Sequence, residues 1–197
     1  YTTIDDPEAY FQVVLFTGDT SAQSITLPGD TNMQPDMVWI KVRDASAYGV
    51  IQDSVRGVTG TDSYNIITDA ASTDVSDAIT ALNSDGFTVG TDANDRSNYN
   101  SQTHVAWCWK ANGSGSSNEA GSINTTATSA NTTSGFSIIT YTGNSTSGAT
   151  IGHGLGVKPA MIFCKNLAST QDWLGYHESF GATKHIKMNE TEAIGTA

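Results

Sequence analysis

The sequence QPDMVWIK, residues 34–41, occurs again in altered form as VKPAMIFCK, residues 157–165. Pro35, Met37 and Lys41 each have an identical residue 124 positions later (161 − 37 = 124). An apolar run of this length, preceded by a proline and followed by a lysine, predicts a buried β-strand. We therefore expect one structural unit to be present twice in this chain.

Side-chain alternation places the apolar residues of this run on two faces. Val38, Ile40 and Val42 share one face of the predicted strand, and Met37 and Trp39 share the other. Because both faces are apolar, both need a covering layer. This pattern is typical of a central strand in a packed sheet.

Further strands are predicted on both sides of this run. In the first copy they lie at 10–17, 24–27, 37–43, 48–54, 64–68, 86–90 and 104–110. In the second copy they lie at 136–142, 161–165, 173–179 and 188–192. The first strands correspond through Phe11 and Phe136 at a spacing of 125 (136 − 11 = 125), and 64–68 corresponds to 188–192. The one-residue slip lies in a turn region, where insertions are tolerated.

One segment of the first copy departs from the strand pattern. Residues 73–82 carry Val75, Ile79 and Leu82 at helical spacing, and Ser, Thr and Asp residues lie near the start. Such residues are common helix N-caps. The pattern fits a short helix.

Composition and charge restrict the class of partner. The 197 residues carry nine Lys and Arg against twenty Asp and Glu, a net charge of −11. Phosphate contacts need basic side chains, so this balance counts against nucleic acid as a partner. The same charge repels an anionic membrane surface. No apolar run approaches the ~20 residues of a membrane span.

The chain divides into four parts. Residues 1–9 are predicted to form an N-terminal arm, 10–111 a first β module, 112–134 a Gly-, Ser-, Thr- and Asn-rich connection, and 135–197 a partial second module. One thin strand around Ile123 fits within the connection. The second copy has no match to 86–90 or 104–110, so we expect the sequence to stop inside that module. The predicted fold class is all-β, with tandem antiparallel sandwich-like modules.

Many blocks of the chain resemble a repeated domain of marine tailed bacteriophages, found in tail fibre and other virion structural proteins. The blocks include YTTIDDPEAYFQ (1–12), PDMVWIKVRD (35–44), SDGFTVGTD (84–92), VAWCWKANG (105–113), GFSIITYTGN (135–144) and GHGLGVKPAMIFCKN (152–166). The resemblance implies a virion component made of tandem β-rich modules, with further repeats after residue 197. It brings no catalytic residues with it.

We therefore expect a non-enzymatic structural protein of a phage virion, a tail fibre or fibre-like appendage involved in host attachment. Its alternatives are a capsid decoration protein and a polysaccharide-binding or depolymerase tailspike. The expected partners are other virion proteins, bound through the N-terminal region, and a host cell-surface glycan. A homotrimer is expected, with apolar side chains around Trp107 and Trp109 meeting at its axis. No cofactor is predicted.

Two loops invite a ligand-binding interpretation. The spacing in Gly152-His153-Gly154-Leu155-Gly156 is G-x-G-x-G, and a strand follows where a dinucleotide site needs a helix, so a chain reversal is preferred. Asp92, Asn94 and Asp95 suggest calcium, but alternation would place Arg96 on the metal and no Glu closes the loop. A surface turn is therefore preferred there.

The remaining candidate residues are dispersed along the sequence, and they do not specify a catalytic or metal site. They are His104, His153, His177, His185, Cys108, Cys164, Trp39, Trp107, Trp109 and Trp173. Both cysteines lie in predicted strands, where small buried thiols are common, and a disulfide between them is disfavoured. Trp173 follows Asp172 at the edge of a predicted loop, so it is the tryptophan chosen for a test of glycan contact.

Overall fold

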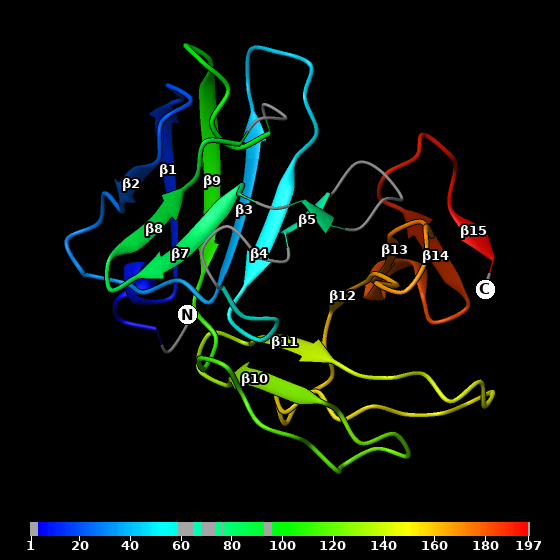
Figure 1. The fold of residues 1–197 in the computed structure, drawn as a ribbon. Helices are drawn as coiled ribbons and strands as arrows, with labels where there is room; N and C mark the ends of the chain where they lie inside the picture. Colours follow the sequence, from blue (N-terminus) through cyan, green and yellow to red (C-terminus); the bar gives the residue numbers. More distant parts are fainter. Residues whose placement is uncertain (1–3, 59–64, 68–73, 76, 93–95, 197) are drawn as a thin grey trace.

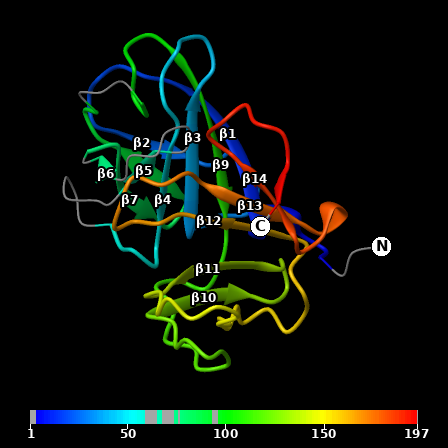
Figure 2. The same ribbon diagram turned by 90° about the vertical axis from the view of Figure 1, so that its right-hand side faces the viewer.

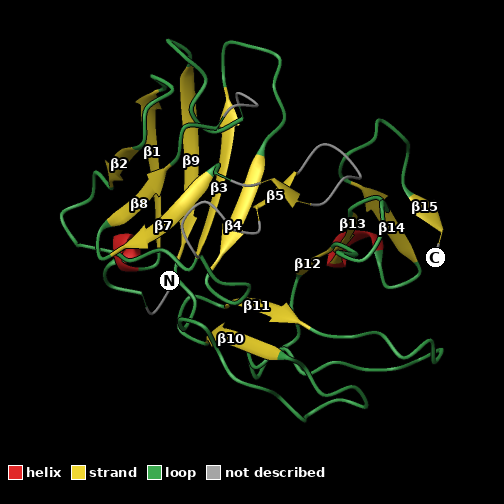
Figure 3. Ribbon diagram, viewed as in Figure 1, coloured by secondary structure: helices red, strands yellow, loops and turns green. Residues whose placement is uncertain are grey.

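The computed structural model describes residues 4–58, 65–67, 74–75, 77–92 and 96–196. Within these ranges the named strands pair in antiparallel fashion, and the helical segments are the 3-10 turns Pro7–Ala9 and Glu178–Phe180 (Figures 1 and 3). The fold class is all-β, which confirms the prediction from the sequence.

The described residues form fifteen strands. Those of the first repeat are β1 (Phe11–Thr17), β2 (Gln23–Thr26), β3 (Met37–Val42), β4 (Val50–Asp53), β5 (Asn65–Ile67), β6 (Asp74–Val75), β7 (Ile79–Asn83), β8 (Gly86–Val89) and β9 (Thr103–Trp109). Those that follow are β10 (Ala127–Asn131), β11 (Phe136–Thr140), β12 (Met161–Cys164), β13 (Leu174–His177), β14 (Lys184–Lys187) and β15 (Gly195–Thr196).

Two sheets form the first repeat. The larger has the order β1-β9-β3-β4-β5-β6, and the smaller has the order β2-β8-β7 (Figure 1). The strand β3 lies between β9 and β4, as expected for a central strand. Val38 and Ile40 are fully buried, and they pack with Phe87 of the smaller sheet in one apolar core. Burial of these faces on each other is what holds the two layers together.

The predicted helix at residues 73–82 is wrong. Asp74–Val75 is strand β6, and Ile79–Asn83 is strand β7, which forms a hairpin with β8. The intervening turn ends at Gly86, whose φ of 117° suits glycine. Helical spacing of three apolar residues is a weak signal, and pairing with β8 outweighs it.

The second repeat reproduces the central hairpin of the first in the same register. In the first repeat, Met37 pairs with Asp53 and Ile40 with Val50. In the second, Met161 pairs with His177, and every pair between Met161 and Cys164 lies 124 residues after its counterpart (161 − 37 = 177 − 53 = 124). The expected duplication is therefore structural in this hairpin.

Hydrogen bonds around the hairpin also recur at this spacing. Ser54 N donates to Asp36 O at 2.8 Å, and Glu178 N donates to Ala160 O at 2.8 Å. The lysine that ends each run donates from Nζ to a carbonyl of the following loop. These bonds join Lys41 to Ala47 and Lys165 to Gln171. The repeated lysine thus closes the β3–β4 and β12–β13 connections, which explains its place in both runs.

One turn keeps its geometry while its side chains change. After β4, the Asp53 carboxylate accepts from Val55 N at 3.1 Å and pairs with Arg56 Nε at 2.6 Å. At the corresponding positions after β13, His177 Nδ1 accepts from Ser179 N at 3.2 Å. The second repeat thus keeps the side-chain cap of the turn. In place of the ion pair, the rings of His177 and Phe180 lie 5.9 Å apart.

The predicted match of 64–68 with 188–192 is wrong. The strand after β13 is Lys184–Lys187, β14, which takes the sheet position of β5, and β15 takes that of β6. In the first repeat Ile67 pairs with Val50, and in the second Lys187 pairs with Leu174, so the paired residues lie 120 positions apart (187 − 67 = 120). The shorter connection thus moves the strand four residues earlier than a fixed spacing of 124 predicts.

The strands around the connection are arranged differently in the two repeats. The predicted connection 112–134 contains β10, which pairs with β11, whereas Ile123 forms an isolated bridge with Ile151. Although β11 corresponds to β1, it lies in a separate two-stranded sheet. The prediction that both repeats share one complete strand order is therefore confirmed for the meander that begins at β3 and β12, and wrong for the first strands.

The described part of the predicted arm folds back onto the first repeat. Glu8 Oε2 accepts from Asp30 N at 2.8 Å, and Asp6 Oδ2 accepts from Thr31 Oγ1 at 2.6 Å. The Asp6 carboxylate also caps the 3-10 turn Pro7–Ala9 through Glu8 N. These bonds attach residues 6–9 to the turn that precedes β3.

Candidate functional site: the outer face of the large sheet

The face of the large sheet opposite the core carries apolar side chains on four strands, β1, β9, β3 and β4. Register places Phe11, Trp109 and Met37 in one cross-strand row. The next row contains Val13, Trp107, Trp39 and Ile51. Rings on this face contact each other, because Trp39 and Trp107 lie 5.6 Å apart and Phe11 and Trp109 lie 5.1 Å apart. Trp107 and Trp109 therefore lie on the same face of β9.

The second repeat covers one half of this outer face. Trp173 is 7 % exposed and packs with Ile51, and Met37, Trp39 and Met188 pack against this pair. The second sheet lies beside β4 and β5 in Figure 1. Trp173 was selected from the sequence as a candidate for glycan contact, and its burial contradicts that role. The sequence around Trp173, including Asp172 and Tyr176, did not indicate that this side chain packs against the first repeat.

A hydrogen-bond network fixes Trp173 in this position. Its backbone N donates to Asn189 Oδ1 at 2.7 Å, and Asn189 Nδ2 donates to Asp172 Oδ1 at 2.9 Å. Lys187 Nζ lies 3.1 Å from both Asp172 Oδ2 and Glu192 Oε2. The hydrogen bonds from Asn189 and Lys187 hold the pKa of Asp172 below its ordinary value. The carboxylate therefore stays charged and keeps the loop in place.

The other half of the outer face is exposed on β1. Phe11 is 40 % exposed, Val13 39 % and Leu15 60 %, and these residues alternate with the buried Gln12 and Val14. A row of exposed apolar side chains on an edge strand is a candidate interaction surface. The sequence contains the alternation of Phe11, Val13 and Leu15, but both faces of this strand are apolar. Periodicity alone therefore could not identify the exposed face.

The candidate calcium loop contains a structural carboxylate. Asp92 is fully buried, and its Oδ2 accepts from Arg96 N at 2.8 Å and from Ser97 Oγ at 2.7 Å. Asn94 and Asp95 lie outside the described residues. Within the described ranges, no group of three or more His, Cys, Asp or Glu residues could hold a metal ion. The bonds to Asp92 are those of a turn cap.

The glycine-rich segment at 152–156 is a bend, as preferred from its spacing. Gly154 has a φ of 72°, and a Cβ there would lie 2.9 Å from Ala130 Cβ of β10. His153 Nδ1 accepts from Leu155 N at 3.1 Å, and its carbonyl accepts from Ser137 Oγ at 2.7 Å. The glycine allows close packing against β10, and the backbone of the bend is bonded to the protein itself.

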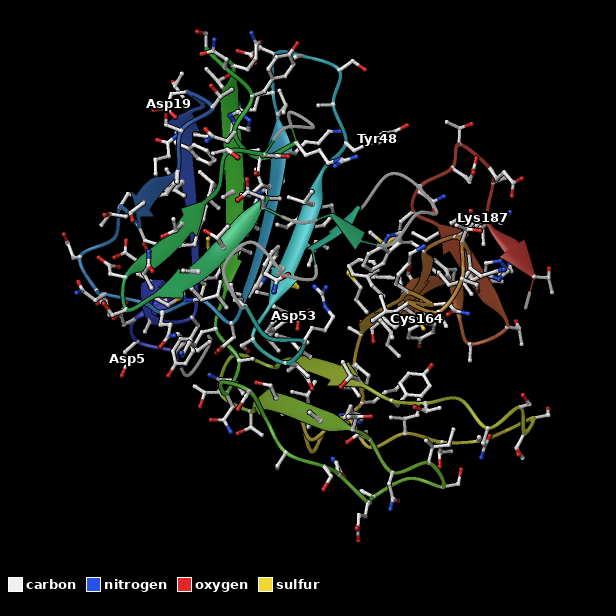
Figure 4. All side chains as sticks on the ribbon, viewed as in Figure 1. Asp5, Asp19, Tyr48, Asp53, Cys164 and Lys187 are labelled. Atoms are coloured by element: carbon white, nitrogen blue, oxygen red, sulfur yellow. The ribbon has the colours of Figure 1, made fainter. Side chains whose placement is uncertain are left out.

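The two cysteines have different environments, and both are free. Cys108 is fully buried in the core, and burial raises the pKa of its thiol to about 12. A thiol with this pKa is a poor nucleophile at neutral pH. Cys164 is exposed on the second sheet (Figure 4), where Tyr141 Oη lies 3.7 Å from its Sγ.

The histidines lie on separate segments, and His104 is the most deeply buried. It is fully buried, its ring stacks on Phe16 at 4.9 Å, and its Nδ1 lies 3.1 Å from Gln102 O. Its Nε2 accepts from Tyr99 N at 3.3 Å. These bonds suit the neutral ring. Burial lowers the pKa of His104, whereas the Gln102 carbonyl and the charges of Asp44 and Asp92 oppose this shift.

A pH-dependent stability is expected from His104. The pKa is lower in the folded chain than in the unfolded chain, so the unfolded state takes up the proton first as the pH falls. The contribution of His104 is thus fully present above its ordinary pKa of ~6.5 and is lost as the pH falls toward the lower folded value. Urea denaturation at pH 7 and pH 5 should show a smaller decrease for His104→Gln than for the wild type. Equal decreases would contradict this role.

A shallow hollow lies between the first repeat and the start of the connection. It has a volume of about 360 Å³, and its lining includes Gln34, Asp36, Ser54, Lys110 and Gly113. Asp36 accepts from Ala111 N at 2.8 Å and from Gly113 N at 3.1 Å, and Lys110 Nζ lies 3.3 Å from it. The Asp36 carboxylate therefore holds in place the segment that follows β9, residues 110–113.

No helix among the described residues is long and apolar enough to span a membrane.

Comparison with known proteins identifies a family but no function. No curated protein and no solved structure matches the chain. The model of one protein family, described as a domain of unknown function (DUF7483), matches residues 6–197. The chain belongs to this family.

Proposed function

We propose that the chain is a non-enzymatic structural component of a bacteriophage virion, a repeated β unit of a tail fibre or fibre-like appendage involved in host attachment. The observation that carries the proposal is the recurrence of the β3–β4 hairpin, pair by pair, in β12–β13. Repeated units that contact their neighbours along one chain build elongated assemblies. The resemblance of the sequence blocks to phage fibre domains suggests that such an assembly belongs to a phage virion.

The state of the titratable groups supports a structural role. Asp53 and Asp92 are buried and bonded to their own turns, and His104 is buried with both ring nitrogens engaged. A catalytic acid or base needs access to a substrate. These three groups have the environment of structural caps, and the shallow hollow beside Asp36 offers little enclosure for a small molecule.

A homotrimer through the exposed part of the outer face is part of this proposal. The side chains of Phe11, Val13 and Leu15 would leave water on contact with two further copies. The net charge of −11 favours this apolar contact over one that buries carboxylates.

Native mass spectrometry tests the trimer directly. We expect a trimer for the wild type and a monomer for Leu15→Asp, because three buried charges near one axis are costly. Leu167→Asp, at a loop position that is 43 % exposed, is the matched control and should remain trimeric. A monomeric wild type at the highest soluble concentration would contradict the trimer.

Antibody labelling of particles tests the functional proposal. Antibodies against residues 1–197 would be applied to particles of the phage that carries the gene, and the gold label would be located by electron microscopy. We expect label on fibres of the tail. Label on the capsid would favour the decoration protein, and particles without label would overturn the proposal. Release of reducing sugar from host polysaccharide by the purified chain would favour the depolymerase.

A further inference from the structure

One Asn-Gly pair occurs in the chain, at Asn112-Gly113, just after β9. Asparagine is chemically labile, because the backbone nitrogen of the next residue can attack its side-chain carbonyl carbon. A following glycine favours this attack, since glycine has no side chain in the way and its backbone adopts many conformations. Figure 2 shows the chain passing at this point from β9 to the sheet of β10 and β11. A chemical change at Asn112 would therefore act at the start of the connection.

The side chain and the backbone of this pair are held to different degrees. Asn112 is exposed, and within the described residues its side-chain amide has no hydrogen-bond partner. The backbone is bonded on both sides. Asn112 N donates to Ser129 Oγ at 2.8 Å, and the Gly113 carbonyl accepts from Ser54 Oγ at 2.7 Å. The carbon that is attacked is thus free to turn, whereas the main chain that carries the attacking nitrogen is fixed.

The attacking nitrogen is held by Asp36. Gly113 N donates to Asp36 Oδ1 at 3.1 Å, and Ala111 N donates to Asp36 Oδ2 at 2.8 Å. Asp36 is 2 % exposed, and Lys110 Nζ lies 3.3 Å from its Oδ2. The N–H of Gly113 therefore points at a buried carboxylate. Loss of its proton would place a negative nitrogen beside that carboxylate, and repulsion between like charges disfavours this state.

We propose that Asn112 is a site of spontaneous deamidation whose rate is set by Asp36. When the hydrogen bond from Gly113 to Asp36 opens, Gly113 N loses its proton to the solvent and bonds to Asn112 Cγ. The Asn112 Nδ2 takes up a proton and leaves as ammonia. Water then opens the cyclic imide at either carbonyl carbon and leaves aspartate or isoaspartate at position 112. The net reaction consumes one water and releases one ammonia, and the inference goes beyond the proposed function.

The modification would change the contact that sets its rate. Either product adds a negative charge near Asp36, and isoaspartate also inserts one carbon into the main chain between Ala111 and Gly113. Asp36 accepts hydrogen bonds from the amides of these two residues, whose spacing suits the unmodified backbone. Once Asn112 has reacted, the segment between β9 and β10 is therefore expected to stay loosened.

Quantitative mass spectrometry of the whole chain tests the proposal. Wild type and variants are kept in mildly alkaline buffer, and samples taken over time are digested. The peptides that contain Asn112 and Asn144 are then separated into their asparagine, aspartate and isoaspartate forms. Asn144 is the internal control, because it is exposed, is followed by Ser145 and lies in the loop after β11.

Asp36→Ala is expected to raise the rate at Asn112 about tenfold or more, because it removes hydrogen bonds to a charged group, and to leave the rate at Asn144 unchanged. Asp36→Asn keeps the size of the side chain and one acceptor but loses the charge, so it should give an intermediate rate. His104→Gln changes a fully buried residue at the other end of β9 and should leave both rates unchanged. In urea, the unfolded wild type should react faster at Asn112 than at Asn144.

Equal rates at Asn112 in the wild type and in both Asp36 variants would overturn the proposal. Acceleration at Asn112 and Asn144 together would assign the effect to general unfolding and would overturn it too. Modified chains, separated from unmodified ones by ion exchange, should also show faster hydrogen exchange at the Ala111 amide, because its bond to Asp36 no longer fits. Unchanged exchange at Ala111 would contradict the expected loosening.

Discussion

Replacing Trp173 by alanine is expected to lower the free energy of unfolding of the second sheet by about 3–5 kcal/mol, the usual cost of removing a buried tryptophan. The indole is 7 % exposed and packs with Ile51 on the outer face of the large sheet. Its removal leaves a cavity among Met37, Trp39 and Met188 and removes an apolar contact between the repeats.

Urea denaturation and limited proteolysis measure this effect. Proteolysis of Trp173→Ala should begin within residues 161–196, while the first repeat remains intact. Leu174→Ala is the matched control, because its side chain is 44 % exposed and its loss should cost less than about 1 kcal/mol. Equal stability of Trp173→Ala and the wild type would show that the repeats do not depend on this contact.

Asp53→Ala is expected to destabilise the first repeat by about 3–5 kcal/mol, because it removes a buried carboxylate that pairs with the Arg56 guanidinium and caps the turn. The side chains of Arg56 and Asp53 are 7 % and 8 % exposed, and Asp53 also accepts from two backbone N–H groups of the turn. Figure 4 shows Asp53 near the end of β4.

The second repeat provides the control for this prediction. His177→Ala, at the corresponding position, removes a partly buried cap and should cost about 1 kcal/mol. The double change Asp53→His with Arg56→Phe introduces the ring pair of the second repeat and should recover more than half of the lost stability in urea denaturation. A double variant no more stable than Asp53→Ala would show that the two turns are not interchangeable.

The sequence predicted most strands and the central hairpin because these features depend on local patterning. Alternation of Val38 and Ile40 with Met37 and Trp39 identified a two-faced strand, and the spacing of 124 residues located its counterpart. Register is fixed by alternation and by the turn, and both are encoded within a few residues. These predictions needed no knowledge of distant contacts.

The errors arose where distant contacts decide the structure. Residues 79–83 have apolar spacing that fits a helix, but a partner strand makes them β7. The burial of Trp173 depends on Ile51, more than a hundred residues earlier (173 − 51 = 122). The exposed row that begins at Phe11 depends on which face the smaller sheet covers. No window of sequence contains this information.

Hydrogen–deuterium exchange of the free chain tests most directly the claim that one unit is present twice, with β3 paired on both sides and β12 on one. The amides of Met37 and Trp39 should exchange at least a hundredfold more slowly than those of their counterparts Met161 and Phe163, because among the strands that the structure describes only the first pair faces a neighbour. Amides of Ile162 and Cys164, which face β13, should be slower than those of Met161 and Phe163. Equal protection of Trp39 and Phe163 in the monomeric chain would contradict the account.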